Sequence, residues 1–305
     1  MIKINKKFIG YVSVVLLLFI IMLNVWVSYY LLANRETQNP AIQQDTCTIK
    51  VEKFQNRKIF IITPKETQNI NKAIFYFHGG AYVQEATNMH WEFIQKLAVD
   101  ANAIIYMPDY PLTPQYTYKD VYNMVEPFYE EYVTNINKRN SNIKNVIVMG
   151  DSAGGGLALG LMEKLSNSNK ESILPNKIIL ISPWLDVRLN NPEIDSVQKD
   201  DIVLSKTGLQ IVGEHYSGND GINSYLVNPI EGDMSKLSNI TIMTGKKDIL
   251  NPDVHRLAEI AKKQGILINI KEYENAYHVW FIEHNGSQAE IDAGYEELLK
   301  ICLEY

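Results

Sequence analysis

Cysteine is scarce in this sequence, with only Cys47 and Cys302 among 305 residues. So low a number excludes a framework of disulfides and a zinc site built on thiolates. One bridge between the two would be possible outside the cell, but two unpaired thiols are the simpler interpretation. The six histidines form no H-x-H, H-x-x-x-H or H-E-x-x-H pair, so the sequence lacks this pattern of a metal site and no cofactor is expected.

Long runs of like charge are also absent, and the formal net charge is -6 at pH 7. Nucleic-acid binding depends on clustered Lys and Arg, so no nucleic-acid partner is expected. We find no internal repeat and no low-complexity tract. The apolar fraction of 46% and the charged fraction of 21% are ordinary for a folded globular protein, and the length suits one large domain or two small ones.

One uncharged apolar segment lies near the N-terminus, at residues 8–33. At about 1.5 Å per residue, a helix of this length can cross a hydrocarbon core roughly 30 Å thick. The polar, proline-containing stretch behind it has the composition of a linker. We therefore expect a tail (1–7), a transmembrane signal anchor (8–33) and a linker (34–45) ahead of the main domain.

The basic residues around this segment predict its orientation. Lys3, Lys6 and Lys7 precede the apolar run, whereas only Arg35 follows closely behind it. This asymmetry predicts a single-pass protein of the cell membrane, with a cytoplasmic N-terminus and an extracellular catalytic domain. Secretion after cleavage of a signal peptide is the alternative. The long apolar run and the lack of a small-x-small site after it favour the anchor.

From residue 46 onward, apolar runs alternate with segments of helical spacing. Runs that are apolar throughout predict parallel strands buried on both faces of a sheet. Two β-rich runs ahead of them predict a hairpin around Asn56. We expect one α/β domain over 46–305, with a mostly parallel sheet flanked by helices. The runs expected to be buried strands are AIFYFHGG (73–80), AIIYMPDY (103–110), NVIVMG (145–150), KIILIS (177–182) and ITIMTG (240–245).

One interval interrupts this alternation, at about residues 187–237. It is polar and rich in loop-forming residues, with one short helical piece near SKTGLQIVGEHY. Intervals of this length within a compact domain are usually lids or binding loops. We therefore expect a lid here.

The stretch VIVMGDSAGGG (146–156) joins an apolar strand to a helix. A dinucleotide-binding fingerprint would need glycine where Ser152 stands, and a phosphate loop would need a lysine earlier than Lys164. What fits is G-x-S-x-G, formed by Gly150, Ser152 and Gly154. At a sharp strand-to-helix turn, larger side chains beside the serine would collide, so this pattern predicts a nucleophile elbow.

A nucleophilic serine requires a base and an acid that orients the base. His278 follows the last strand run and precedes the last helix, which is the required place; His284 is the weaker choice. Further histidines in helical or lid segments are expected at the solvated surface: His90, His215 and His255. Asp248 lies in the loop after ITIMTG, whereas Asp253 falls in the first turn of a helix and is expected to interact with its dipole. The predicted triad is Ser152, Asp248 and His278, in the chain order of the α/β-hydrolases.

Acyl transfer also needs N–H donors for the developing oxyanion. Ala153, directly after the serine, supplies one. FHGGAY is the second source, because Gly79 and Gly80 follow a strand and leave their N–H groups unobstructed. A His-Gly-Gly turn with a serine elbow two strands later is hard to attribute to chance.

Six motifs, in their order and spacing, resemble the hormone-sensitive-lipase-like family of α/β-hydrolase esterases, of the bacterial acetyl esterase and carboxylesterase type. They are HGGAY (78–82), DYPLTP (109–114), GDSAGGGLAL (150–159), SPWLDV (182–187), GKKDIL (245–250) and YHVW (277–280). The resemblance covers roughly residues 45–305. It implies an α/β-hydrolase fold with a lid inserted after the sixth strand. It also implies the triad named above and an oxyanion hole of Gly79, Gly80 and Ala153.

The sequence departs from the family pattern in three motifs. Ala81 stands where many members have a third glycine, residues 110–115 replace Y-R-L-A-P-E with YPLTPQ, and His278 is followed by Val-Trp rather than Gly-Phe. The two N–H groups most needed are still present, so activity is expected to survive. Three aromatic residues would either narrow the acyl pocket or pack in the core or lid: Tyr82, Trp184 and Trp280.

Together these features predict a serine carboxylic-ester hydrolase that acts on short- to medium-chain acyl esters through an acyl-enzyme. A deacetylase or acetyltransferase acting on an envelope polymer or lipid, or a peptidase or amidase with the same triad, is the alternative. A catalytically silent ligand-binding hydrolase fold is the non-enzyme alternative. The expected partners are a small-molecule ester and, through the N-terminal helix, the membrane, while the oligomeric state stays open.

Overall fold

A mostly parallel sheet forms the centre of the part of the chain that the structure describes. Its strands are β1 (Cys47–Phe54), β2 (Arg57–Pro64), β3 (Lys72–Phe77), β4 (Ala103–Pro108), β5 (Asn145–Asp151), β6 (Lys177–Ile181), β7 (Ile240–Gly245) and β8 (Ile268–Tyr273). They are ordered β1-β2-β4-β3-β5-β6-β7-β8. The pairs β1·β2 and β2·β4 are antiparallel, and every other pair is parallel. The predicted hairpin and the five predicted buried strands are confirmed.

The computed structural model describes residues 46–66, 69–139 and 142–304, which lie within one unit, Asn39–Tyr305. The predicted tail, transmembrane anchor and linker (1–45) lie outside the described residues. Within the three described ranges, no helix combines the length and the apolar character needed to span a bilayer.

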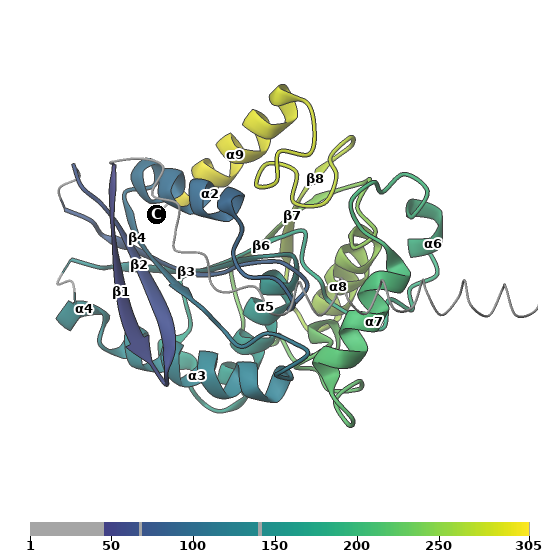
Figure 1. Ribbon diagram of the computed structural model, residues 1–305, viewed down its shortest axis with the longest axis horizontal. Coiled ribbons are helices and arrows are strands. Elements are labelled where there is room, and N and C mark those ends of the chain that lie inside the picture. The colour runs from purple at the N-terminus through teal and green to yellow at the C-terminus, as the bar shows by residue number, and fades with distance from the viewer. Residues whose placement is uncertain (1–45, 67–68, 140–141, 305) are drawn as a thin grey trace, which may run out of the picture. The chain divides into compact units, whose positions relative to one another are not determined.

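Helices cover both faces of the sheet. They are α2 (Asn88–Asp100), α3 (Tyr118–Thr134), α4 (Ile136–Arg139), α5 (Ser152–Asn167), α6 (Ile194–Val197), α7 (Lys206–Ser217), α8 (Asn251–Lys263) and α9 (Gln288–Leu303), with short 3-10 turns at Glu171–Ile173 and Pro229–Glu231. Helices α2 and α9 lie on one side of the sheet, and α3 and α5 on the other (Figure 1).

Strand alternation divides the buried side chains into two cores. In β3, Phe75 and Phe77 pack into the core beneath α3, α5 and α8, whereas Ile74 and Tyr76 pack into the core beneath α2 and α9. Because successive side chains point to opposite faces, a strand between two helical layers is apolar at every position. This burial on both faces explains the continuous apolar runs of the sequence.

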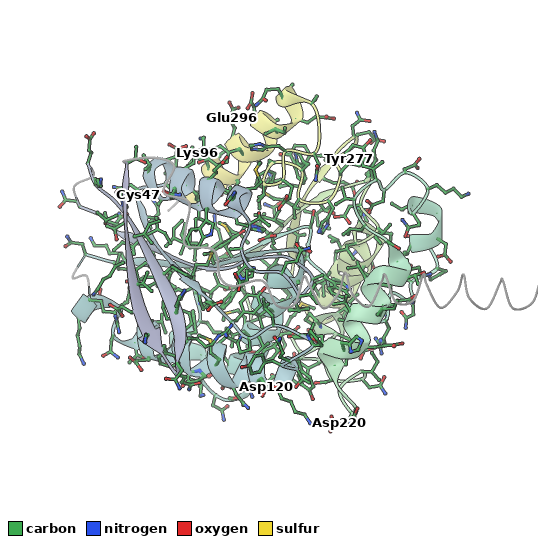
Figure 2. All side chains as sticks on the ribbon, in the orientation of Figure 1. Cys47, Lys96, Asp120, Asp220, Tyr277 and Glu296 are labelled. Atoms are coloured by element: carbon green, nitrogen blue, oxygen red, sulfur yellow. The ribbon has the colours of Figure 1, made fainter. Side chains whose placement is uncertain are left out.

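Helices α2 and α9 lie side by side on their face of the sheet, as the labelled Lys96 and Glu296 indicate in Figure 2. The Tyr295 hydroxyl of α9 donates to Asp100 of α2 at 2.8 Å, and the Lys96 ammonium lies 3.6 Å from the centre of the Tyr295 ring. These contacts join the last helix of the chain to a helix almost 200 positions earlier, and so close this face of the domain.

The two cysteines are free and buried. Cys47 lies on the edge strand β1 and its Sγ contacts the Gln95 carbonyl oxygen at 3.5 Å, while burial raises the pKa of the Cys302 thiol in α9 to about 12. The interpretation as two unpaired thiols agrees with this arrangement.

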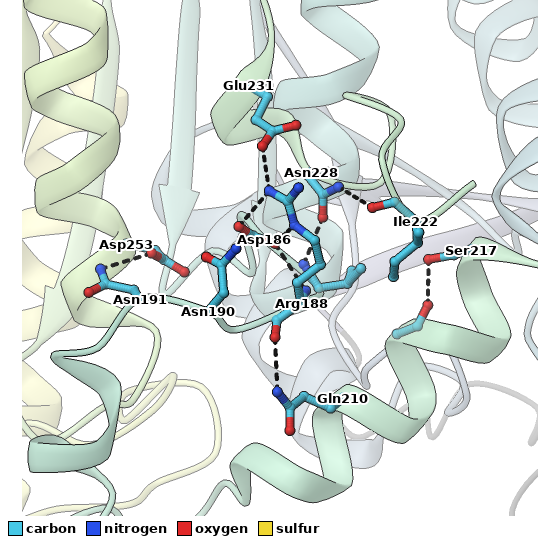
Figure 3. A network of polar contacts seen from close by, with 12 residues as sticks. Asp186, Arg188, Asn190, Asn191, Gln210, Ser217, Ile222, Asn228, Glu231 and Asp253 are labelled. Atoms are coloured by element: carbon cyan, nitrogen blue, oxygen red, sulfur yellow. Dashed lines mark hydrogen bonds and ion pairs between the residues drawn. The ribbon is translucent and has the colours of Figure 1, made fainter. Parts of the chain in front are cut away.

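Residues 187–237, which we call the inserted segment, connect β6 to β7 and contain α6, α7 and one 3-10 turn. Side-chain contacts fix the segment where it begins (Figure 3). The Arg188 guanidinium binds both carboxylate oxygens of the fully buried Asp186 at 2.8 Å. The Arg188 carbonyl oxygen accepts a hydrogen bond from the Gln210 side-chain amide of α7. Asn228 then accepts the Val187 N–H at 3.1 Å. These contacts join the start of the segment to Gln210 and Asn228 further along it.

Candidate active site

Ser152 lies at the sharp turn between β5 and α5, with a φ of +52°. Residues with a side chain rarely adopt this left-handed conformation. A Cβ on Gly150 would lie 2.3 Å from the Gly154 carbonyl oxygen, and one on Gly154 would lie 2.0 Å from the Phe77 carbonyl oxygen. The backbones approach so closely that only glycine fits at these two positions.

The structure brings the three residues of the predicted triad together. His278 Nε2 lies 2.9 Å from Ser152 Oγ, and His278 Nδ1 lies 2.8 Å from Asp248 Oδ2. Asp248 is fully buried in the β7–α8 loop, where its other oxygen accepts the Leu250 N–H at 2.9 Å. The Val279 N–H donates to Ser182 at 3.2 Å and so fixes the loop that carries His278. This is the geometry of a nucleophile, a base and an orienting acid.

The surroundings of His278 favour its charged form. Burial by itself would lower the pKa of this imidazole, but the charge and hydrogen bond of Asp248 outweigh burial and raise the pKa above its ordinary value of 6.5. An imidazole stabilised as a cation is suited to holding a proton taken from serine.

Asp253, the acid left out of the predicted triad, lies in the first turn of α8, and the carboxylate hydrogen-bonded to His278 is that of Asp248. It is buried, accepts the Asn191 side-chain N–H at 3.0 Å, and has its pKa raised by burial to about 6.

A cavity of about 280 Å³ opens beside Ser152 and His278. Val203, Leu204 and Leu209 of the inserted segment contribute apolar side chains to its lining. The lining also includes polar residues, namely Gln84, Thr87, His90, Glu283 and Asn285. A group bound at Ser152 therefore meets both apolar side chains and hydrogen-bonding groups.

The predicted oxyanion donors need one correction. The Gly79 N–H already donates to the Asp151 carboxylate at 2.9 Å, so it is not available to a substrate oxygen. Gly80 and Ala81 line the cavity instead, with φ of +105° and +51°. Ala153 lies in the first turn of α5, where backbone N–H groups have no partner within the helix. The candidate donors are therefore Gly80 and Ala81, which line the cavity, and Ala153, which follows Ser152 at the start of α5; Ala81 is the one missed from the sequence.

The three aromatic residues considered for the acyl pocket are buried in the two cores, and none is among the residues that line the cavity. The Tyr82 ring stacks on Tyr216 with centroids 3.7 Å apart and also faces Trp184. The Trp280 indole fits against Gly294 of α9 and donates to the Glu290 carbonyl at 2.9 Å. Because partners from other elements hold these rings in the cores, the core-packing interpretation agrees with the structure and the acyl-pocket interpretation does not.

His90 contradicts the expectation of a solvated surface role. It is buried, lines the cavity, and its Nε2 lies 3.2 Å from Asp151 Oδ2. Its spacing from Ile94 and Leu97, four and seven positions on, places it on the apolar side of α2, and this signal could have revealed its burial. The other histidines considered, His215, His255 and His284, are exposed.

The fold and site together define a class of protein. A mostly parallel sheet of this order, with a serine at the β5–α5 turn and an acid and a histidine after β7 and β8, is the α/β-hydrolase arrangement. The chain belongs to the family of the α/β hydrolase fold, whose model matches residues 74–282. The resemblance noted from the sequence motifs is thereby confirmed.

Relatives were found by sequence and by structure. The chain is 28% identical over 261 residues to an esterase of Acinetobacter venetianus, covering 83% of this chain and 82% of that protein. It is 24% identical over 213 residues to an acetyl-hydrolase of Streptomyces hygroscopicus, covering 70% and 69%. A crystal structure of an esterase from the bacterial hormone-sensitive lipase family aligns with a TM-score of 0.75 at 19% identity, covering 90% and 89%. The structural likeness bears on the fold.

Proposed function

We propose that this chain is a serine carboxylic-ester hydrolase that cleaves short- to medium-chain acyl esters through an acyl-enzyme. The observation that carries the proposal is the continuous chain of contacts from Ser152 Oγ through His278 to Asp248, beside an open cavity. The relatives named esterase and acetyl-hydrolase support an ester as the substrate.

In the proposed first half-reaction, Ser152 Oγ bonds to the ester carbonyl carbon while its proton passes to His278 Nε2. The carbonyl oxygen becomes an oxyanion that accepts hydrogen bonds from the N–H groups of Gly80 and Ala81, in residues 79–81 that we call the oxyanion loop, and from that of Ala153. Each such donor is typically worth roughly 10²–10³ in rate. The tetrahedral intermediate then expels the alcohol, whose oxygen takes the proton from Nε2. An acyl-enzyme on Ser152 remains.

In the second half-reaction, a water molecule gives a proton to His278 Nε2 while its oxygen attacks the acyl carbon. Collapse of this intermediate breaks the bond to Ser152 Oγ, which regains the proton and releases the carboxylic acid. Asp248 holds the imidazole in the orientation that both steps require.

The size of the cavity supports a short acyl group. About 280 Å³ is at or just below the lower end of ligand pockets, which typically range over roughly 300–1,000 Å³. We propose that the inserted segment serves as the lid, because Val203, Leu204 and Leu209 contribute apolar side chains to the lining of the cavity. The acetyl-hydrolase relative fits the same size range.

The decisive experiment compares the protein with Ser152→Ala, using p-nitrophenyl acetate and a fluorophosphonate label. Turnover and labelling by the unaltered protein, both lost in the variant, are expected. A variant that keeps most of its rate would refute the role of Ser152. A folded protein that neither turns over the ester nor accepts the label would favour the silent binding fold.

A further inference from the structure

Asp151 is a buried carboxylate immediately before the nucleophile, and the proposed triad does not use it. Three donors from three different places converge on it. The Tyr76 hydroxyl of β3 and the Gly79 N–H of the oxyanion loop bind Oδ1, and His90 of α2 lies 3.2 Å from Oδ2. Asp151 therefore connects the nucleophile turn to the oxyanion loop and to the start of α2.

The contacts of His90 determine which nitrogen faces Asp151. Nδ1 accepts the Thr87 backbone N–H at 3.1 Å, as part of the capping box that begins α2. In the neutral imidazole, an accepting Nδ1 leaves the proton on Nε2. In the imidazolium, which Asp151 favours by raising the pKa of His90 against the effect of burial, Nε2 is protonated as well. His90 Nε2 then donates to Asp151 Oδ2. The His90 ring is thus held by hydrogen bonds at both nitrogens, with its Nε2–H directed at Asp151.

The hydrogen bond from His90 bears on the reaction because Asp151 is charged. Burial alone would raise the pKa of this carboxyl, but His90 and the Tyr76 hydroxyl outweigh burial and hold the pKa below its ordinary value. An ionised carboxylate beside Ser152 would oppose the oxyanion that forms there, because charges interact strongly in a buried site. Donors that take up its negative charge reduce this opposition.

We propose that His90 is a positioning residue for ester cleavage. By donating a hydrogen bond to the Asp151 carboxylate, His90 fixes Gly79, and with it the oxyanion loop, relative to Ser152. The same hydrogen bond reduces the repulsion between the carboxylate charge and the oxyanion. The inference rests on the proposed function and assigns His90 no contact with the substrate.

Two substitutions divide the contacts of His90 between them. In His90→Asn, the amide oxygen takes the place of Nδ1 and keeps the cap of α2, but nothing reaches Asp151. In His90→Gln, the amide nitrogen takes the place of Nε2 and keeps the donor to Asp151, but the Thr87 N–H loses its acceptor. A merely structural role would make the two variants equally harmful, or would make the loss of the cap the worse change.

The test measures kcat and KM for p-nitrophenyl acetate, thermal unfolding, and the rate of fluorophosphonate labelling at Ser152. His90→Asn is expected to lower kcat by about 10- to 100-fold with KM within about threefold, which is part of the effect of one oxyanion donor. His90→Gln is expected to restore kcat to within about threefold of the unaltered protein. Labelling rates should follow kcat.

A His90→Asn variant with unchanged kcat, or a His90→Gln variant equally impaired, would overturn the inference while the unaltered protein still turns over ester. An unaltered protein that neither labels nor turns over would instead refute the proposed function. If His90→Asn does not fold, Tyr76→Phe removes a different donor to Asp151 without changing α2. The inference then requires a loss in kcat rather than in KM, and an unchanged kcat would contradict it.

Discussion

Ser152 adopts a backbone conformation with a φ of +52°, which typically costs about 1–3 kcal/mol and persists only where surrounding contacts enforce it. The enforcing contact here is the close packing of the turn against the end of β3, where the Gly154 backbone meets the Phe77 carbonyl. The position of the nucleophile therefore depends on the absence of one side chain two residues away.

Gly154→Ala is expected to disrupt this turn, because the new Cβ would lie 2.0 Å from a backbone oxygen that cannot move aside. Activity should fall at least a hundredfold, and the free energy of unfolding should fall by several kcal/mol, of the order of overpacking in a core. Gly208→Ala in α7 is the matched control, since its Cβ would meet only ordinary contacts near 3.5 Å. Denaturant unfolding and ester turnover of both variants test the difference, and equal behaviour would contradict it.

The raised pKa of His278 predicts a pH dependence. The imidazole must be neutral to accept the serine proton, and Asp248 raises its pKa above 6.5, so kcat/KM should fall as the pH drops through a value above 6.5. In Asp248→Asn the largest raising cause is removed while burial still lowers the pKa of His278, so the acid limb should shift to lower pH. The rate should also drop by roughly 10³–10⁴.

A pH–rate profile checks this prediction, with Asp253→Asn as the control. Asp253 lies five positions further on and is bound to Asn191 rather than to His278. The control should therefore keep the profile of the unaltered protein. An Asp248→Asn profile with the same acid limb would show that Asp248 does not set the pKa of His278.

The candidate triad could be predicted from the sequence because each member follows its own strand within a few residues. Gly80 and Ala153 were predicted as oxyanion donors in the same way, but Gly79 was wrongly included, because its N–H donates to a carboxylate 72 positions away. His90 was missed for a similar reason, since its partner Asp151 is 61 positions distant. Local spacing determines where a residue stands in the chain, but not which distant group satisfies its hydrogen bonds.

At the scale of whole elements, the inserted segment is held at its base by Asp186 and Arg188 (Figure 3). Asp186 is fully buried, and Arg188 also binds Glu231 of the second 3-10 turn. Removing one partner of a buried ion pair is costly because the remaining charge is left unpaired. The ion pair thus gives the aspartate of the motif SPWLDV a structural role that could not be derived from the sequence.

Arg188→Met is expected to lower the free energy of unfolding by about 2–4 kcal/mol, with Arg256 at 3.4 Å left as the weaker partner of Asp186. Lys119→Met is the control, because the Lys119–Asp220 pair is exposed on both sides and its loss should leave the unfolding midpoint unchanged. Thermal and denaturant unfolding measure both. If Arg188→Met lowers the free energy of unfolding no more than the control does, the Asp186–Arg188 ion pair does not stabilise the domain.

The inserted segment is also connected to the acid loop by Asp201. This buried carboxylate accepts the N–H groups of Val203 and Leu204, which line the cavity, and that of Ile249, which follows Asp248. One side chain thus holds an apolar cavity wall and the acid loop at a fixed separation.

Asp201→Ala is expected to raise KM for p-nitrophenyl butyrate about tenfold, because the wall that contacts the acyl chain loses its support. It should also lower the free energy of unfolding by about 2–4 kcal/mol, since buried N–H groups lose a charged acceptor. Asp200→Ala is the control, because Asp200 is an exposed neighbouring acid whose backbone N–H donates to Val197 and whose side chain makes no hydrogen bond among the described residues. An unchanged KM in Asp201→Ala would show that Val203 and Leu204 do not contribute to acyl binding.

At the scale of the whole molecule, the parallel sheet and its helices could be predicted because each buried strand carries its own signature of continuous apolar residues. The helical piece predicted near SKTGLQIVGEHY is confirmed as α7, which buries Leu209 and Tyr216 in the core. The loops of the inserted segment could not be predicted, because they are held by side-chain contacts with Asp186, Asp201 and Asn228. The sequence therefore predicts the elements that depend on periodicity better than those that depend on individual partners.

We also propose that residues 8–33 form a membrane anchor. Their hydropathy predicts it, and they precede a domain whose first strand begins at Cys47. The full chain is expected to sediment with membranes and to resist extraction by salt, because a membrane-spanning helix is held by apolar burial rather than by charge. A chain that begins at Thr46 retains every described element and should stay in the supernatant with unchanged kcat/KM for p-nitrophenyl acetate. The mass of the mature N-terminus distinguishes the anchor from a cleaved signal peptide. A full chain found in the supernatant with its N-terminus intact would refute both.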